Sequence, residues 1–469
     1  MRTIGKYIVR GLLGRGGMGK VYKAEHPILG KMVALKCLEP PEILTELVGK
    51  KRLEERFMAE SVTMAGLNHP NIVDVLDIET TDENIFYVMD YYCNNLGIMI
   101  GETYRTETPS RPLGVDKTIH YATQTLKGLN RLHHAGIIHR DIKPYNMMVT
   151  DQDEVKICDF GLSIYRGETT AGPANLNMGS PYYAAPEQEQ KTADATFSTD
   201  IYSLGVMIHR MLTGMLPGGR NKDKNGSLLN LIHPDLDDSW DDFLLKAIAT
   251  EPDRRFTDAN EMLNRLMALK HQWDEKKEAL CRLNPAPSAS PDTATGEQKR
   301  RNRQPRRTPV KINTKMAPAV FPVDSLWRPK SYHESEFHKV NDKVIRDCST
   351  GLFWQIAGSS YPVSFGDARE YIADLNISNF GNLNHWRLPT VDELLSIMMP
   401  VPLGRNLCLA SVFDHLQQWL WSIDRKSFTA AWYASMDLGF IHWQDFTARY
   451  YVKGVCTGSD EPDRVSGSV

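Results

Sequence analysis

The chain has 469 residues, which is too long for one ordinary hydrophobic core and predicts two or three domains. Its 55 basic and 58 acidic side chains give a formal net charge of -3, which excludes a global field that would draw the whole chain onto nucleic acid or an anionic membrane. Seven scattered cysteines without a C-x-x-C pair argue against a disulfide framework, and no run approaches the roughly 20 apolar residues of a membrane helix. We therefore expect a cytoplasmic protein without a membrane span.

The first part of the chain predicts a β-sheet with one helix. Short β-rich runs at 7–13, 20–26 and 32–38 are broken by glycines, and the charged stretch 50–67 has a helical pattern. From about residue 118 to 283, long amphipathic helical patterns dominate, and the first of them stops at Gly136. This order predicts a sheet-rich lobe followed by a helical lobe.

A glycine-rich run lies between the first two predicted strands. It contains Gly14, Gly16 and Gly19 in a G-x-G-x-x-G pattern, with Gly17 inside it and Val21 two residues beyond. In a hairpin bend, glycines allow backbone N–H groups to approach the phosphates of a nucleotide. Taken alone, the triplet is equally compatible with an ordinary turn.

Two charged groups of opposite sign follow the glycines. Lys36 lies on the next predicted strand, where its ammonium would reach the α- and β-phosphates of a nucleotide. Glu60, in the middle of the predicted helix, is the expected countercharge, and Glu54 and Glu55 are the alternatives.

A second cluster of polar residues gives the most specific signal. His139, Arg140 and Asp141 precede Lys143 and Asn146, and the triplet Asp159, Phe160 and Gly161 follows after a hydrophobic strand pair. Phosphoryl transfer requires an aligned hydroxyl, metal ions and a cation near the transferred group. Asp141 would accept the proton of the substrate hydroxyl, Lys143 would steady the γ-phosphate, and Asn146 and Asp159 would hold magnesium.

With these motifs, residues 7–272 resemble the bacterial eukaryotic-type serine/threonine protein kinases. The resemblance implies a two-lobed α+β kinase fold over residues 1–283, ATP with magnesium or manganese, and protein substrates. It also implies that Lys143, two residues after Asp141, marks specificity for serine and threonine. The residues that it places around the adenine are Leu13, Val21, Ala34, Met89, Asp90 and Tyr92, with Met89 as the gatekeeper.

The resemblance also assigns structural and regulatory residues. Glu187, in an Ala-Pro-Glu run at the end of the segment that docks the peptide, would pair with Arg255, and Asp200 would hold the catalytic-loop backbone. Ser180 would bond the catalytic groups. Arg140 would pair with a phosphate on Thr169 or Thr170. Tyr145 departs from the pattern, because relatives usually have a small or acidic residue there.

After the kinase-like part the composition changes. Residues 284–323 are rich in proline and contain the basic cluster 299–307, which predicts a disordered linker with solvated charge rather than a site for nucleic acid. Residues 324–460 regain turn-punctuated short strands and hold seven of the nine tryptophans, and residues 461–469 should be a flexible tail.

The tryptophan-rich part contains the run W-R-L-P-T-x-x-E-L at 386–394, in which Thr390 and Glu393 predict a helix-starting capping box. With its neighbouring motifs this run resembles an uncharacterised bacterial domain found at the C-terminus of a Legionella collagen-like protein. That resemblance implies a small α+β fold like C-type lectins or the formylglycine-generating enzyme. We expect the tryptophans to form a core and, less strongly, a ligand face, so that a binding module for an unknown ligand or protein is favoured over a second enzyme.

The leading functional hypothesis is an active serine/threonine kinase with a C-terminal recognition or regulatory domain. The alternative is a kinase-shaped binding scaffold with little catalysis. The presence of Lys36, Glu60, Asp141, Asn146 and Asp159 together favours the enzyme, since the loss of one such charge typically lowers the rate by orders of magnitude.

Overall fold

The computed structural model describes residues 2–16, 19–81, 84–103, 107–159, 164–165, 182–190, 195–218, 228–283, 304–400 and 407–457. The chain divides into two compact units, Met1–Ala286 and Pro287–Val469. The predicted site residues Gly17, Phe160, Gly161, Thr169, Thr170 and Ser180 lie outside the described residues, as do 284–303 of the predicted linker and the predicted tail.

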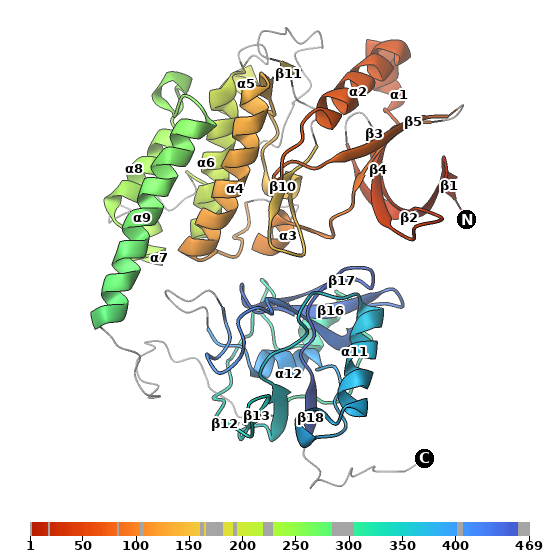
Figure 1. The fold of residues 1–469 in the computed structure, drawn as a ribbon. Coiled ribbons are helices and arrows are strands. Elements are labelled where there is room, and N and C mark those ends of the chain that lie inside the picture. The colour runs from red at the N-terminus through yellow and green to blue at the C-terminus, as the bar shows by residue number, and fades with distance from the viewer. Residues whose placement is uncertain are drawn as a thin grey trace. The chain divides into compact units, whose positions relative to one another are not determined.

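The first unit begins with a curled six-stranded antiparallel sheet (Figure 1). Its strand order is β1-β2-β3-β4-β6-β5, and the bounds are β1 Thr3–Ile4, β2 Tyr7–Arg15, β3 Gly19–Glu25, β4 Met32–Leu38, β5 Val75–Thr80 and β6 Ile85–Asp90. One face of this sheet carries a cluster of buried side chains that includes Tyr7, Tyr22, Leu35, Phe86 and Val88. The sheet-rich lobe predicted from the sequence is therefore present.

Two helices accompany the sheet, α1 (Glu42–Val48) and α2 (Lys50–Ala65). In α2 the buried residues are Leu53, Phe57, Ser61 and Met64, whose spacing of three and four places them on one helical face. The Phe57 ring contacts the ring of Tyr87 on β6, with centroids 5.3 Å apart. Glu60 lies about one helical turn after Phe57, so this contact places it beside β6. Strand β6 pairs with β4, which carries Lys36.

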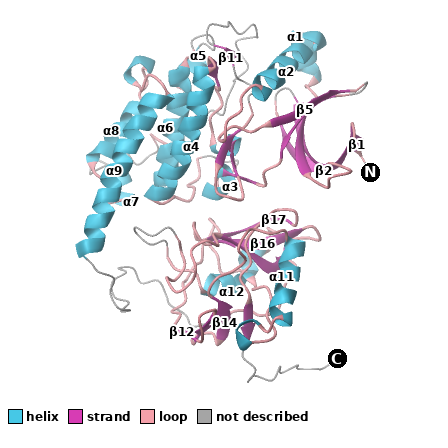
Figure 2. Cartoon of the chain, in the orientation of Figure 1, coloured by secondary structure: helices cyan, strands magenta, loops and turns pink. Residues whose placement is uncertain are grey.

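The rest of the first unit is mainly helical (Figure 2). The helices are α3 (Leu96–Ile100), α4 (Val115–His134), α5 (Pro186–Gln190), α6 (Phe197–Thr213), α7 (Leu228–Ile232), α8 (Asp238–Ala247) and α9 (Ala259–Leu283). Short strands β7 (Asn94–Asn95), β8 (Ile137–Ile138), β9 (Met147–Val149), β10 (Val155–Ile157) and β11 (Ile164–Tyr165) form small sheets between them. Helix α4 ends two residues before Gly136, whose positive φ of 77° suits glycine and stops the helix as predicted.

The second unit contains two antiparallel sheets and short helices. One sheet has the order β12-β13-β14-β18 and the other β15-β16-β17. The bounds are β12 Phe337–Lys339, β13 Val344–Asp347, β14 Leu352–Gln355, β15 Trp419–Arg425, β16 Ala430–Ser435, β17 Phe440–Asp445 and β18 Val455–Thr457, with α10 Ala317–Val320, α11 Phe365–Ile377 and α12 Val391–Ser396. This unit is α+β, as expected.

Tryptophans form the core of the second unit. Trp354, Trp386, Trp419, Trp421 and Trp432 are buried, and the Trp432 indole donates a hydrogen bond to the backbone oxygen of Ile312. Trp327 and Trp443 are partly buried against the same core. The interpretation of the tryptophans as core residues is confirmed for the five buried ones.

The segment 304–323 differs from the sequence expectation of a disordered linker. Ile312, Ala317, Phe321 and Val323 are buried in the core of the second unit. The Arg306 guanidinium contacts the carboxylates of Asp392 and Asp424, each at 2.7 Å. Composition alone misled the prediction because Arg306 pairs with acidic partners about 90 and 120 residues further along the chain, and the few apolar residues of the segment enter the core.

Candidate active site

Lys36 lies between two carboxylates. Its Nζ is 2.8 Å from Oε1 of Glu60 on α2 and 2.9 Å from Oδ1 of Asp159. Lys36 and Glu60 are buried, whereas Asp159 is exposed on one side. Glu54, one of the alternative partners, instead pairs with Lys50 at 3.8 Å.

The charges of this cluster stabilise one another. Burial alone would lower the pKa of Lys36, but the charge of Asp159, with Tyr87 and Glu60, outweighs it and holds the pKa well above its usual value. The Lys36 ammonium lowers the pKa of Asp159 to about 2. The Tyr87 hydroxyl donates to the same Glu60 oxygen at 3.1 Å. Asp159 is therefore ionised at neutral pH.

Asp141 is fixed by its own loop. Lys143 Nζ lies 2.7 Å from Asp141 Oδ2, and Asn146 Nδ2 donates to the same oxygen at 3.0 Å and to the Asp141 backbone oxygen at 2.8 Å. The Asn146 backbone oxygen accepts from Cys158 N at 3.0 Å, which ties this loop to the residue before Asp159. The two polar clusters predicted from the sequence are thus joined in space.

Asp200, at the start of α6, holds the backbone before Asp141. Its carboxylate accepts hydrogen bonds from His139 N at 2.9 Å, Arg140 N at 2.8 Å and His133 Nε2 at 3.0 Å. Burial would raise the pKa of Asp200, but the His133 hydrogen bond and nearby positive groups lower it. Arg140 and Asp159 adopt positive φ angles of 68° and 65°, a conformation that is uncommon outside glycine and that surrounding contacts must maintain.

Glu187 and Arg255 form a bidentate ion pair, with both nitrogen-to-oxygen distances at 2.8 Å. Gln188, the next residue, donates from Nε2 to the Arg140 backbone oxygen at 2.9 Å. The Ala-Pro-Glu run is therefore connected to the catalytic loop by a short path of hydrogen bonds. Gln188 was not predicted, since a lone glutamine carries no motif.

The glycine hairpin is formed by β2 and β3. Gly14 pairs with Val21 and lies at an irregularity in the register, and Gly16 N donates to the Gly19 backbone oxygen at 2.8 Å. A Cβ on Gly19 would lie 1.9 Å from the Cys37 backbone oxygen, so only glycine fits beside β4. Val21 in turn pairs with Lys36 across the sheet.

The remaining residues predicted around the adenine lie on adjacent strands or just beyond them. Ala34 pairs with Met89 across β4 and β6, and both are buried. Leu13 on β2 is exposed. Asp90 pairs with Lys31 at 2.7 Å, and Tyr92 is half-buried.

Asn146 and Asp159 fit the requirements of a magnesium ion carried by a nucleotide. The Asn146 nitrogen makes both of the side chain's hydrogen bonds, which leaves the carbonyl oxygen for a metal, and Asp159 is an ionised, exposed carboxylate. Within the described ranges no group of three or more His, Cys, Asp and Glu side chains forms a metal cage. Magnesium usually takes one or two protein ligands and completes its shell with phosphate and water.

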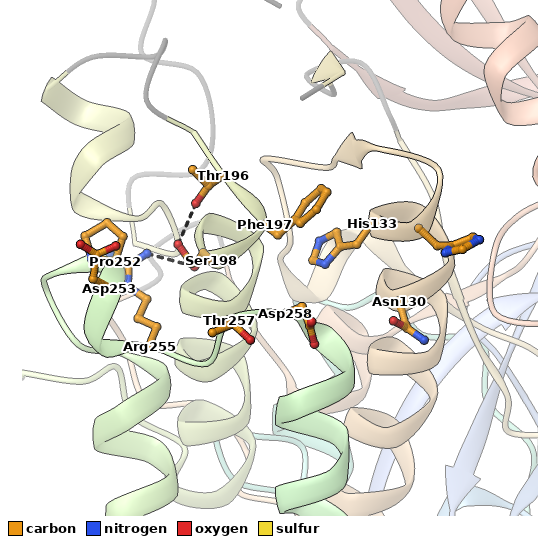
Figure 3. A pocket seen from close by; sticks show the side chains of 11 residues that line it. Asn130, His133, Thr196, Phe197, Ser198, Pro252, Asp253, Arg255, Thr257 and Asp258 are labelled. Atoms are coloured by element: carbon orange, nitrogen blue, oxygen red, sulfur yellow. Dashed lines mark hydrogen bonds between the residues drawn. The ribbon is translucent and has the colours of Figure 1, made fainter. Parts of the chain in front are cut away.

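A separate cavity of about 550 Å³ lies between the end of α4 and the start of α6 (Figure 3). His133 and Phe197 line it and stack with centroids 4.5 Å apart, and Arg255 and Asp258 line it on another side. His133 bonds Asp200, and Arg255 pairs with Glu187. The cavity therefore borders the supports of the catalytic loop rather than its reacting groups.

Comparison with known proteins agrees with this geometry. The protein kinase domain profile matches residues 7–273, more than half of the chain. The chain belongs to the protein kinase family.

Among the relatives of this kinase are two bacterial serine/threonine-protein kinases. PrkC of Bacillus subtilis is 30% identical over 270 residues, which cover 56% of this chain and 40% of the relative. The kinase pkn3 of Myxococcus xanthus is 34% identical over 221 residues, which cover 45% of this chain and 38% of the relative. The chain thus spans about two fifths of the curated relatives that it matches.

The second unit also has a match. The Lcl C-terminal domain profile matches residues 343–456, which agrees with the resemblance drawn from the tryptophan-rich motifs. In the parts of the chain that the structure describes, no helix is both long and apolar enough to cross a membrane.

Proposed function

We propose that this kinase transfers the γ-phosphoryl group of ATP to serine and threonine hydroxyls of proteins. The observation that carries the proposal is the pair of linked clusters, Lys36–Glu60–Asp159 and Asp141–Lys143–Asn146, in which each lysine contacts the carboxylates of its own cluster. Similarity to serine/threonine-protein kinases supports the choice of acceptor.

In this proposal each side chain has a short-range task. Asp141 orients the acceptor hydroxyl and takes its proton, and the Lys143 and Asn146 hydrogen bonds keep its carboxylate in one position. Lys36, held straight by Glu60, binds the α- and β-phosphates. Magnesium, or manganese, would be held by Asn146 and Asp159 and would offset the negative charge of the phosphates.

The nucleotide would be bound against the six-stranded sheet. Leu13, Val21 and Ala34 would enclose the adenine, and Met89 would lie at its rear edge, with backbone groups near Asp90 and Tyr92 bonding to it. The glycine hairpin would cover the phosphates, because Gly14, Gly16 and Gly19 leave its backbone bare.

The second unit is proposed to recognise a ligand or protein and so to localise or regulate phosphorylation. Five of its tryptophans are buried, so we place the recognition surface on its exposed residues. A cytoplasmic location is also part of the proposal, because ATP is available there and Cys37, Cys158, Cys408 and Cys456 are buried as free thiols.

The test is transfer of labelled γ-phosphate to the kinase itself and to a generic basic protein. Asp159→Asn and Lys36→Met should each lower the transfer rate by about 100-fold or more, since each removes a charge that acts on the phosphates. Lys50→Met, which changes an exposed lysine paired with Glu54, is the matched control and should transfer at the unmodified rate. Equal labelling by all four proteins would instead support the binding scaffold without catalysis.

A further inference from the structure

The connection between α3 and α4, residues 101–114, receives the two tyrosines that precede the Ala-Pro-Glu run. The Tyr183 hydroxyl lies 3.1 Å from both carboxylate oxygens of Glu102, and both residues are buried. The exposed neighbour Tyr182 donates to Glu107 on the same connection. The segment expected to dock the peptide is thus attached to this connection.

Glu102 also contacts the catalytic loop, through its backbone oxygen. The Tyr145 hydroxyl donates to the Glu102 backbone oxygen at 2.6 Å. The Tyr145 ring lies against α3 at Gly97, where an added Cβ would be 2.9 Å from the ring. A small or acidic residue at 145 could not make this contact, so the departure from the family pattern has a structural use.

Glu102 is buried close to charged groups. Burial raises the pKa of its carboxyl above the usual value, although Arg210, Tyr183 and Lys143 act in the opposite direction. Arg210 on α6 is itself buried and donates to the Thr108 backbone oxygen at 3.0 Å, so it belongs to the same support. Lys143 is the lysine that bonds Asp141. Glu102 therefore bonds the docking segment through its carboxylate and the catalytic loop through its backbone oxygen.

We propose that Glu102 is a positioning residue for the protein substrate. Through Tyr183 and Tyr145 it fixes the docking segment relative to the catalytic loop, so that the acceptor hydroxyl reaches Asp141. The inference rests on the proposed kinase function. It predicts an effect on the peptide and not on the nucleotide, because Lys36 is held by Glu60 and Asp159, whereas Glu102 is bonded by Tyr145 and Tyr183.

The experiment compares Tyr183→Phe, Tyr145→Phe and their combination in the full chain. Each variant removes one hydroxyl and keeps its ring, so the fold should persist, which thermal melting in the presence and absence of ATP would check. We expect each single change to raise the KM for a serine peptide about tenfold, with the KM for ATP within twofold of the unmodified value. Because both hydroxyls act through residue 102, the combined variant should show a smaller effect than the product of the two.

Tyr22→Phe is the matched control, since it also removes a hydroxyl that bonds a carboxylate, that of Glu39, but lies on β3 of the six-stranded sheet, and its peptide KM should stay within twofold. If Tyr183→Phe leaves the peptide KM unchanged, or raises the KM for ATP by the same factor, Glu102 is no positioning residue for the peptide. If the unmodified chain transfers no phosphate while still binding ATP, the proposed function fails first, and the two failures are thereby distinguished.

Discussion

The guanidinium group of Arg255 uses all three nitrogens to hold Glu187 and the backbone oxygens of Ser198, Ala249 and Thr250. None of its side chain is exposed, and Glu187 is almost as buried. Such a group is costly to remove from one side only, because the remaining carboxylate loses its countercharge without regaining water.

Arg255→Ala should therefore lower the free energy of unfolding of the first unit by roughly 3 to 5 kcal/mol. Lys270→Ala is the control, since its pair with Asp274 is exposed on α9 and should contribute less than about 1 kcal/mol. Chemical denaturation followed by far-ultraviolet circular dichroism measures both. A loss of similar size in the two variants would show that the buried Arg255–Glu187 pair stabilises the unit no more than an exposed pair does.

Sequence reasoning at this scale succeeds where chemistry restricts the residue type within a short motif. Lys36, Asp141 and Asp159 each lie in a run whose order points to phosphate chemistry, and the structure brings them together. Glu102 was missed, since it bonds Tyr183 across 81 positions and no local pattern marks either partner. Contacts of that kind arise only from the folded path of the chain.

Helix α12 shows how one element is specified by its first turn. Thr390 Oγ1 accepts from Glu393 N at 3.2 Å, and Glu393 Oε2 accepts from Thr390 N at 2.8 Å, so the predicted capping box is confirmed. Both partners lie three residues apart, which makes the motif readable from the sequence. The segment 304–312 lies across this start, because Thr390 Oγ1 also donates to the Arg306 backbone oxygen at 2.6 Å.

Arg306→Ala should destabilise the second unit by about 2 to 4 kcal/mol, because Asp424 is fully buried and would lose its cation. Lys315→Ala, an exposed basic residue nearby, should change the stability by less than about 0.5 kcal/mol. Denaturation followed by tryptophan fluorescence reports mainly on this unit, since seven of the nine tryptophans lie in it. Equal midpoints for the two variants would contradict the anchoring role of Arg306.

At the scale of the whole molecule, one buried lysine makes the stability of the second unit depend on pH. Lys453 in the second unit is fully buried, with Nζ 2.7 Å from the Ile356 backbone oxygen and 5.2 Å from the centre of the Phe413 ring. Burial lowers the pKa of this ammonium to about 7, although Asp414 acts in the opposite direction. Between that value and the ordinary value of 10.5 the unfolded chain binds more protons than the folded unit.

The second unit should therefore gain stability as the pH rises from about 7 towards 10.5, by roughly 2 kcal/mol between pH 7 and pH 9. Lys453→Met should remove most of this dependence, since it leaves no group to titrate at that position. Fluorescence-detected denaturation at the two pH values gives the measurement. A pH dependence that is the same with and without Lys453 would show that another group is responsible.

The division into a kinase unit and a tryptophan-rich unit follows from composition, because the change from helical periodicity to a proline-rich stretch is abrupt. Where the second unit begins could not be derived in this way. Its first core residue, Ile312, lies within the segment that composition assigned to the linker, and only contacts with distant strands reveal its place.

Because residues 304–323 pack in the second unit, the stretch that connects the two units is shorter than the linker predicted from the sequence. Helix α9 ends at Leu283 and the described part of the second unit begins at residue 304, so 20 residues at 284–303 connect them. Even fully extended, such a stretch reaches at most about 70 Å. Under the proposed recognition role, a protein bound by the second unit would stay within the reach of this stretch from the end of α9, which would raise its effective concentration at the kinase unit.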